Sequence, residues 1–391
     1  MQAAPVVHWS EDGEARSAHW RSERGAPPPG KMVIADDRMT ADDAYGLASQ
    51  GIGLLWRGDF QNARQMLTAL ASRADRPPRQ PGKARRAAGQ APSPSPSKSP
   101  AELFNLERQS RAQRARTLGM LLIPLDADYS IALRRAPDTR QACMEAYGAG
   151  QDACVVSLRE LLGVVGAHEW RRKGIELPAI GGRIHPHYGV FAPIRSEYVD
   201  LVASTPLPAA AKSSPIAFDI GTGTGVLAAV LARRGIQRVV ATDQDPRALA
   251  CARENVERLG LAGRVEVVPA DLFPEGQAAL VVCNPPWVPA RPSSPLEHGI
   301  YDPESRMLQG FLRRLPAHLA PGGEGWLILS DLAEHLGLRS REELLAAIEG
   351  AGLKVVNRID VRPRHPKVSD ADDPLHGARK AEVTSLWRLS V

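Results

Sequence analysis

The sequence predicts an α/β protein whose second half folds as a parallel sheet and whose N-terminal region is mainly helical. After residue 214, short runs rich in β-branched residues alternate with helical stretches, and several of those runs contain a continuous apolar stretch. Continuous apolar strands are typical of a parallel sheet that helices cover on both faces. The helical region is predicted because apolar residues between positions 47 and 70 recur at the spacing of one helix face.

Composition is that of an ordinary globular protein. The chain has 391 residues, of which 43% are hydrophobic and 24% charged, and this length suggests two or three domains of about 150 residues each. No apolar stretch approaches the roughly 18 residues of a membrane span. The first twenty residues lack the apolar core of a secretory signal. We therefore expect a cytoplasmic protein that does not enter a membrane.

The cysteines are Cys143, Cys154, Cys251 and Cys283, and none forms a CxxC pair. This spacing argues against a zinc site, and a disulfide framework is not expected in so long a chain. We predict reduced thiols and no metal site.

Positive charge concentrates in the first half of the chain. The formal net charge is +5, and residues 76–116 alone carry ten cations and two acids. Such an excess favours an acidic partner such as nucleic acid. A solvated tail that keeps the protein in solution is the alternative, and the sequence leaves both open.

A helical hairpin is predicted over residues 40–75. Thr40 and Asp43 form a capping box, and a helix is expected from there to about Arg57. Asp59 is a suitable N-cap for the second helix.

Two segments are expected to lack a fixed structure. Residues 1–39 show no sustained periodicity, and residues 76–100 contain seven prolines and six cations but no large apolar residue. Such composition cannot bury enough surface to order a chain. We therefore read 1–39 as disordered and 76–100 as a basic linker. A basic helix over 101–117 then opens a mainly helical N-terminal domain, 101–182.

Residues 183–391 form the last predicted domain. Ligands of such sheets bind beyond the carboxyl ends of the strands, where the strand order reverses. Strands are predicted at 216–220, 238–243, 264–268, 279–283, 325–330, 354–359 and 383–390, and helices at 226–234, 246–259, 306–319 and 341–349.

A glycine-rich turn follows the first of these strands. Asp219 precedes Gly221, Gly223 and Gly225, and glycines there let the backbone turn tightly and approach a ligand. The dinucleotide fingerprint needs its third glycine one residue later, where Val226 stands. The pattern therefore favours a nucleoside-type ligand, with an ordinary βα turn as the alternative.

Two further acids follow the next strands. Asp243 lies at the end of the second strand, where a carboxylate can accept hydrogen bonds from both ribose hydroxyls. Asp245, before Pro246, is assigned to capping the helix. Asp271 can accept a hydrogen bond from an adenine amino group, or is a surface acid in a turn.

The most specific motif ends the fourth strand, and it is Asn284-Pro285-Pro286-Trp287. The side-chain oxygen of Asn284 and the carbonyl of Pro285 can accept two N–H bonds from a planar amino group. Two prolines stiffen the loop, and the indole offers a flat face for stacking. The alternative is an Asn-Pro turn with a core tryptophan.

Together these residues resemble class I S-adenosylmethionine-dependent methyltransferases, and more narrowly the small-domain group with [N/D]-P-P-[F/Y/W] after the fourth strand. The likeness covers roughly residues 183–391. It implies a Rossmann-like sheet of seven strands, the last one antiparallel, and S-adenosylmethionine as cofactor. Members include ribosomal RNA guanine and adenine N-methyltransferases and release-factor glutamine N5-methyltransferases. Trp287 stands where Tyr or Phe is commoner.

The resemblance also implies residue roles. Cofactor contacts would come from Asp219, Gly221, Gly223 and Gly225 for the methionine part, Asp243 for the ribose, Asp271 for the adenine, and Asn284. The catalytic residues that grip the acceptor would be Asn284, Pro285, Pro286 and Trp287.

A second segment, residues 183–193, resembles the part of these enzymes that precedes the first strand and closes over the cofactor. Phe191 lies in this segment and is assigned to a substrate loop. We read His185 and His187 as residues that pack this loop.

A second substrate-facing loop is expected after the acceptor motif, with Tyr301, Asp302, Glu304 and Arg306. The alternative for these four residues is the N-cap and first turn of a helix with Pro303 at its first position.

The predicted function is methyl transfer to a planar nitrogen, and the first candidate for the acceptor is an exocyclic amine in RNA or a ribosomal particle. Alternatives are a glutamine amide in a protein and a small molecule. A non-catalytic RNA-binding protein with a relic fold is a further alternative, against which the intact glycines, Asp243 and Asn284 argue.

Overall fold

The computed structural model describes residues 5–76, 98–150, 152–292, 295–363, 370 and 373–391. Most of the predicted linker 76–100 therefore lies outside the described residues. Internal contacts divide the chain into two compact units, Met1–Gly166 and Ala167–Val391. The division falls inside helix α5 (Leu158–Lys173) and not at the predicted boundary after residue 182.

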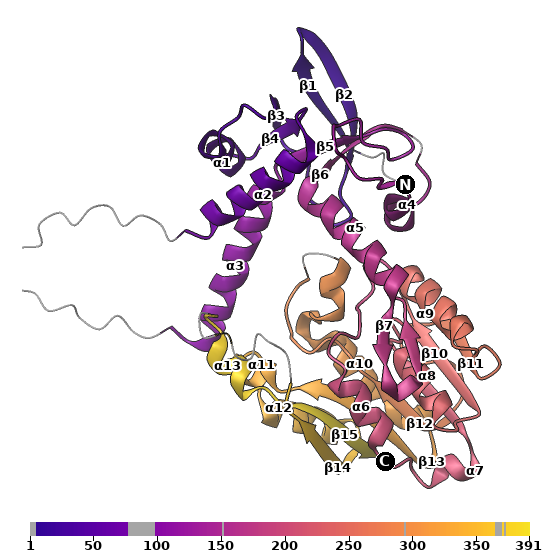
Figure 1. Cartoon of the computed structure of the whole chain (residues 1–391). Helices are drawn as coiled ribbons and strands as arrows, with labels where there is room; N and C mark the ends of the chain where they lie inside the picture. The colour runs from indigo at the N-terminus through magenta and orange to yellow at the C-terminus, as the bar shows by residue number, and fades with distance from the viewer. Residues whose placement is uncertain (1–4, 77–97, 151, 293–294, 364–369, 371–372) are drawn as a thin grey trace, which may run out of the picture. The chain divides into compact units, whose positions relative to one another are not determined.

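The second unit is built on a seven-stranded sheet with the order β11-β10-β9-β12-β13-β15-β14 (Figure 1). All neighbouring strands are parallel except β15, which runs antiparallel to both β13 and β14. The predicted seven strands with an antiparallel last strand are confirmed. They are β9 (Ile216–Ile220), β10 (Arg238–Asp243), β11 (Val265–Pro269), β12 (Ala278–Cys283), β13 (Leu319–Ser330), β14 (Lys354–Val361) and β15 (Thr384–Ser390).

Helices cover both faces of this sheet. In β10, Val239 and Ala241 join one hydrophobic core, formed with α6 and α8, whereas Val240 joins the other, formed with α10 and α12. Successive strand side chains point to opposite faces, so a strand covered on both sides must be apolar throughout. The helices are α6 (Glu197–Ser204), α7 (Ala210–Ser213), α8 (Val226–Arg233), α9 (Pro246–Arg258), α10 (Arg306–His318), α11 (Leu332–His335), α12 (Arg341–Gly350) and α13 (His376–Ala381).

Short elements complete the second unit. A hairpin of β7 (Ile175–Leu177) and β8 (Gly182–Ile184), joined by the 3-10 turn η1 (Pro178–Ile180), precedes the sheet. The 3-10 turns η2 (Pro295–Gly299) and η3 (Pro303–Ser305) lie between β12 and α10.

The first unit is also an α/β fold, so the predicted mainly helical N-terminal region is wrong. Its six strands lie in the order β1-β2-β6-β5-β4-β3. They are β1 (Val6–Glu11), β2 (Glu14–Arg21), β3 (Lys31–Ala35), β4 (Ile52–Trp56), β5 (Leu121–Leu125) and β6 (Cys154–Ser157). Its helices are α1 (Ala41–Ser49), α2 (Phe60–Ala74), α3 (Pro100–Leu118), α4 (Arg140–Tyr147) and the start of α5.

Three of these strands lie in residues 1–39, where disorder was expected. β1 and β2 pair antiparallel, and only Val7 and Trp20 of this hairpin are buried. With so few buried positions the strands carry no clear alternation of apolar and polar residues, which is why the sequence did not reveal them.

The predicted helical hairpin is also wrong in part. Thr40 and Asp59 cap their helices, accepting bonds from the backbone N–H groups of Asp43 and Gln61. Between the helices, however, Ile52–Trp56 is strand β4, and four of its five residues are buried. A short apolar run buried on both faces has no periodicity that separates a strand from a helix turn.

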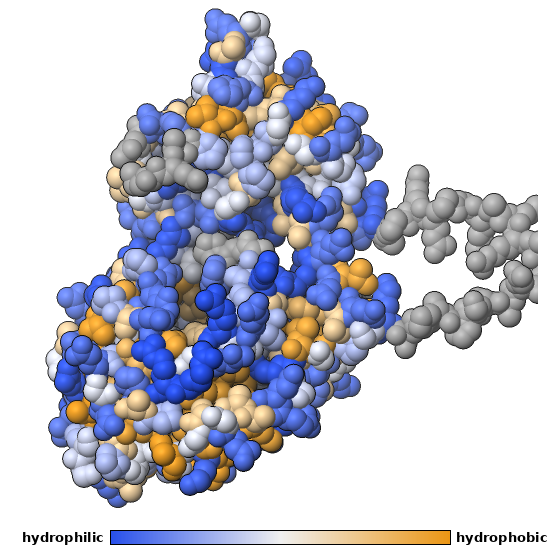
Figure 2. Space-filling view, turned by 180° about the vertical axis from the view of Figure 1, so that it is seen from behind, coloured by the Kyte–Doolittle hydropathy of each residue, from blue (hydrophilic) through white to orange (hydrophobic). Residues whose placement is uncertain are grey.

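The described residues contain no helix long and apolar enough to cross a membrane. On the face seen in Figure 2, hydrophobic side chains form small patches separated by hydrophilic ones. The cysteines are free and buried. Within the described ranges, no three His, Cys, Asp or Glu side chains cluster as metal ligands would.

Close packing of α10 against the sheet gives a first prediction. A Cβ at Gly325 in β13 would lie 2.3 Å from Leu315 Cδ2 of α10, and Leu315 is fully buried. We expect Gly325→Ala to lower the free energy of unfolding by about 1–3 kcal/mol in chemical denaturation, because overpacking forces the helix away from the strand. Gly263→Ala, where a Cβ meets nothing, is the matched control, and equal stability of the two variants would contradict this packing.

Candidate active site

Three predicted site segments leave the sheet at the same edge. Ile220 of β9 pairs in register with Thr242 of β10 on one side and with Cys283 of β12 on the other. Adjacent strands lie about 4.8 Å apart. The next residues along the three strands, which therefore start side by side, are Gly221, Asp243 and Asn284.

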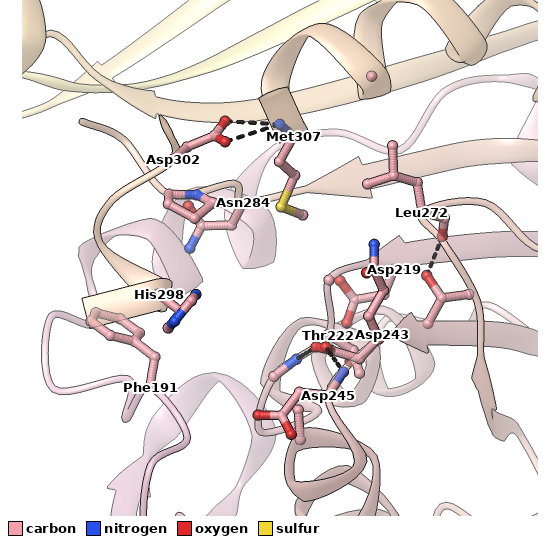
Figure 3. Close-up of a pocket in the computed structure, with 18 of the residues that line it drawn as sticks. Phe191, Asp219, Thr222, Asp243, Asp245, Leu272, Asn284, His298, Asp302 and Met307 are labelled. Carbon is pink, nitrogen blue, oxygen red and sulfur yellow. Dashed lines mark hydrogen bonds between the residues drawn. The ribbon is translucent and has the colours of Figure 1, made fainter. Parts of the chain in front are cut away.

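A cavity of about 850 Å³ opens at this edge. Figure 3 shows Asn284, His298 and Phe191 on one side of it and Asp219, Thr222 and Asp243 on the other. The predicted site residues that line it are Phe191, Asp219, Gly221, Gly223, Asp243, Asp271, Asn284 and Pro286. The cavity lining does not include Gly225, Pro285, Trp287 or Tyr301.

The glycine-rich turn needs glycine for different reasons at each position. Gly221 and Gly223 have φ of +70° and +55°, which L side chains rarely adopt. A Cβ at Gly221 would lie 2.5 Å from Met307 Cε, whereas one at Gly223 would meet no atom within 4 Å. The empty space beside Gly223 is therefore part of the cavity. Gly225 packs against α9, since its Cβ would lie 3.3 Å from Ala252.

Asp219 is buried at the centre of the turn, with 1% of its surface exposed. Its Oδ2 accepts hydrogen bonds from Thr222 Oγ1 at 2.6 Å and from the Ala228 N–H at 2.9 Å. Burial raises the pKa of Asp219 to about 6, and these two bonds oppose the rise. The carboxyl group is thus a buried acid that a cationic ligand would help to ionise.

Asp243 is held at the cavity by backbone groups. Its Oδ2 accepts from the Gly223 N–H and its Oδ1 from the Asp245 N–H, each at 3.0 Å. Each carboxylate oxygen can accept a further bond, so both remain able to receive hydroxyl groups. Burial also raises the pKa of Asp243. Asp245 caps α9 by accepting from the Arg247 N–H, as predicted.

Asp271 lies at the exposed rim, and its Oδ1 accepts a hydrogen bond from Gln244 Nε2 at 2.6 Å. The residue after it, Leu272, has a positive φ of 68°. The Leu272 carbonyl accepts from Thr242 Oγ1 at 2.5 Å. This bond ties the rim to the end of β10.

Asn284 and Trp287 contact each other directly. Trp287 Nε1 donates a hydrogen bond to Asn284 Oδ1 at 2.9 Å. The indole is half-buried and packs against both hydrophobic cores of the unit. The expectation that Trp287 offers a stacking face to the acceptor does not fit this placement.

The segment before β9 is fixed to α9. His187 Nε2 lies 2.6 Å from Glu254 Oε2, and the His185 N–H donates to Asn255 Oδ1 at 2.8 Å. Both histidines therefore hold the segment and neither lines the cavity, in agreement with the packing role predicted for them. Phe191 projects to the cavity and rests on Gly299, where an added Cβ would lie 2.7 Å from Phe191 Cβ.

The loop before α10 contributes Asp302, one of the predicted substrate-loop residues, and leads into Met307, to which the sequence assigned no role. Asp302 is 5% exposed and accepts from the N–H groups of Met307 and Leu308, so it caps α10 while lining the cavity. Tyr301 instead bridges to Val288. The pair Asp302-Pro303 is a recognisable helix start, but no local signal marks Met307, whose contact with Gly221 is tertiary.

The raised pKa of Asp219 predicts a pH-dependent stability. A carboxyl group whose pKa is higher in the folded state stabilises the fold below the unfolded pKa, and this contribution disappears as the pH rises through about 6. We expect Asp219→Asn, which retains an oxygen for both hydrogen bonds, to gain stability relative to the parent between pH 4 and 6.5. The gain should be roughly 3 kcal/mol. A difference in unfolding free energy that does not vary with pH would contradict this.

Comparisons with known proteins agree with this geometry. The family model described as "Methyltransferase small domain" matches residues 182–346. Ribosomal protein L11 methyltransferase of Pelotomaculum thermopropionicum is 40% identical over 144 residues, covering 36% of this chain and 39% of that protein. Release factor glutamine methyltransferase of Cereibacter sphaeroides is 34% identical over 171 residues, covering 39% and 58%.

The chain thus spans between about two fifths and three fifths of the length of these two relatives. A methyltransferase from Pyrococcus furiosus overlaps 59% of this chain and 98% of its own, with 19% identity and a TM-score of 0.37. Residues 182–346 therefore match the methyltransferase small domain, and the strand order of the second unit and the cavity at its edge agree with that match.

Proposed function

We propose that this chain transfers a methyl group from S-adenosylmethionine to a planar nitrogen, such as an exocyclic base amine or a carboxamide. One observation carries the proposal: Asn284 shares a single cavity with the glycine turn and with Asp243. The cofactor site and an amide able to bind the acceptor therefore meet at one edge of the sheet.

The chemistry of the lining fits the cofactor. Gly221 and Gly223 give the backbone close access, and Asp243 keeps acceptor positions for two hydroxyl groups. Burial raises the pKa values of Asp219, Asp243 and Asp302, all of which line the cavity. Buried carboxyl groups of this kind favour a cationic ligand, and S-adenosylmethionine carries a sulfonium and an ammonium group. When bound, it supplies an activated methyl group.

The chain's task is then to hold the acceptor nitrogen in line with that methyl group, at roughly 3–3.5 Å. An amide or arylamine nitrogen is a poor nucleophile because its lone pair is delocalised. A hydrogen bond from this nitrogen to Asn284 Oδ1 favours the positive charge that develops on it. The second acceptor, the Pro285 carbonyl, remains a prediction. The methylated nitrogen is acidic enough to lose its proton to water, so the proposal needs no dedicated base.

RNA is our first candidate for the acceptor, and its support comes from the cavity rim. Arg306 and Arg313 are exposed, line the cavity and lie seven residues apart on α10, roughly 10 Å along its axis. No ion pair to either is found among the described residues. A base turned out of a strand brings its flanking phosphates to such a rim.

A glutamine amide in a protein is the second candidate. The observation that favours it is the likeness to a release factor glutamine methyltransferase. In that case the Asn284 motif would bind a carboxamide by the same contacts, and the rim arginines would face an acidic protein surface.

Removal of the Asn284 amide tests the proposed function. We expect Asn284→Ala to lower methyl transfer into cell lysate by about 100-fold or more, because the acceptor loses the group that orients it. Cofactor affinity should change little, since the glycine turn and Asp243 are untouched; isothermal titration measures it. Retained methyl transfer would contradict the role of Asn284. Loss of methyl transfer together with cofactor affinity would contradict the separation of roles, in which Asn284 binds the acceptor while the glycine turn and Asp243 bind the cofactor.

The rim arginines give a separate test of the acceptor. Arg306→Gln combined with Arg313→Gln should weaken binding of a fluorescent RNA hairpin and reduce the slope of log Kd against log salt by about one per arginine.

The control for this test is Arg253→Gln on α9, because Arg253 is exposed and does not line the cavity. Salt-independent RNA binding, or equal binding by parent and double variant, would rule out this RNA contact. Transfer that depends on the two arginines but survives RNase treatment would favour the protein acceptor.

A further inference from the structure

The hydrogen bond between Trp287 and Asn284 fixes which way the Asn284 amide faces. An indole nitrogen only donates, so the atom 2.9 Å from Trp287 Nε1 must be the amide oxygen. The amide nitrogen then lies on the opposite side. Figure 3 shows this nitrogen on the side of Phe191 and His298, both of which line the cavity.

Trp287 itself has little freedom to move. Its ring packs against both hydrophobic cores. The chain just after it is tied to the loop before α10, because the Val288 N–H donates to the Ile300 carbonyl at 3.2 Å and the Asp302 N–H to the Val288 carbonyl at 2.9 Å. The indole donor is thus presented from a fixed position.

The orientation decides what Asn284 can bind. Its NH₂ group can donate into the cavity, and one lone pair remains on its oxygen. The matching partner carries an N–H next to a hydrogen-bond acceptor, as a carboxamide does, and as an amino-heterocycle does in the bidentate pairing of asparagine with adenine. An alkylammonium group has donors only, so it would leave the Asn284 NH₂ without a partner, which costs free energy when the group is desolvated.

We propose that Trp287 is a positioning residue that locks the Asn284 carboxamide, so that the cavity accepts amides and amino-heterocycles and rejects alkylamines. Phenylalanine at this position could not make the bond, because its ring has no donor. This inference rests on the proposed function and deepens it by naming the residue that orients the Asn284 amide toward acceptors of that class.

A spectroscopic test examines whether Trp287 fixes the orientation of the Asn284 amide, and it does not require the natural acceptor. In the ¹⁵N-labelled full chain with S-adenosylhomocysteine bound, the Asn284 side-chain NH₂ signals are assigned by their loss in Asn284→Ala. We expect Trp287→Phe to shift these signals and to broaden them as the amide begins to rotate. Trp170→Phe is the matched control, since Trp170 is 50% exposed and does not line the cavity. Unchanged Asn284 signals in Trp287→Phe would overturn the proposal.

A selectivity test uses three probes: a short glutamine peptide, the same peptide with lysine in its place, and an adenosine-containing trinucleotide. The parent should methylate the glutamine peptide or the trinucleotide and not the lysine peptide. Trp287→Phe should lower kcat by about tenfold with an unchanged KM for the cofactor, and should reduce the preference over lysine. Replacement of Trp287 by 3-benzothienylalanine, which keeps the shape but lacks the N–H, should behave like Trp287→Phe.

The failures of the two proposals are distinguishable. Unchanged Asn284 signals in Trp287→Phe, together with methylation of the glutamine peptide or the trinucleotide by the parent, overturn the role of Trp287 and leave the proposed function standing. Methylation of the lysine peptide by the parent, or absence of cofactor binding, overturns the proposed function itself. If none of the three probes is methylated, the amide signals alone decide whether Trp287 holds Asn284.

Discussion

The site depends on the register of three parallel strands. β9 lies between β10 and β12, and Ile220 is aligned with Thr242 and with Cys283. Because parallel strands end at the same edge, this alignment starts the glycine turn, Asp243 and Asn284 side by side. A shift of one residue would turn each side chain to the other face, so the buried cores on both faces that fix the register also fix the chemistry.

Burial gives the cavity its electrostatic character. The carboxyl groups of Asp219, Asp243 and Asp302 line it, and burial raises all three pKa values. Backbone N–H groups and Thr222 partly compensate the lost hydration. The acids lie deep while Arg306 and Arg313 stand exposed at the rim. The lining thus combines buried acids with two exposed arginines at the rim, and the proposed cationic cofactor and anionic acceptor rest on these charges.

Local patterns in the sequence predicted which residues lie at the carboxyl ends of the strands, but not the tertiary contacts that those residues make. Asn284, Asp243 and the glycines each follow a continuous apolar strand, so their place at the sheet edge could be inferred from neighbouring residues alone. The contacts of Met307 with Gly221 and of Trp287 with Asn284 join residues whose partnership only the folded chain reveals. In the first unit, the apolar run Ile52–Trp56 was ambiguous, and the exposed hairpin β1–β2 carried too few buried residues to show a pattern. Fold prediction therefore failed in the first unit, at one apolar run buried on both faces and at one hairpin with almost no buried residues.

The central claim is that Asn284 and the glycine turn direct a methyl group onto a planar nitrogen. The most direct measurement is to label cell lysate with ¹⁴C-methyl S-adenosylmethionine and the purified chain, hydrolyse the products completely, and identify the methylated unit by mass spectrometry. The account predicts label on an N-methylated base or on N5-methylglutamine. Label on an alkylamine, a hydroxyl, a carboxyl or a thiol group would contradict it.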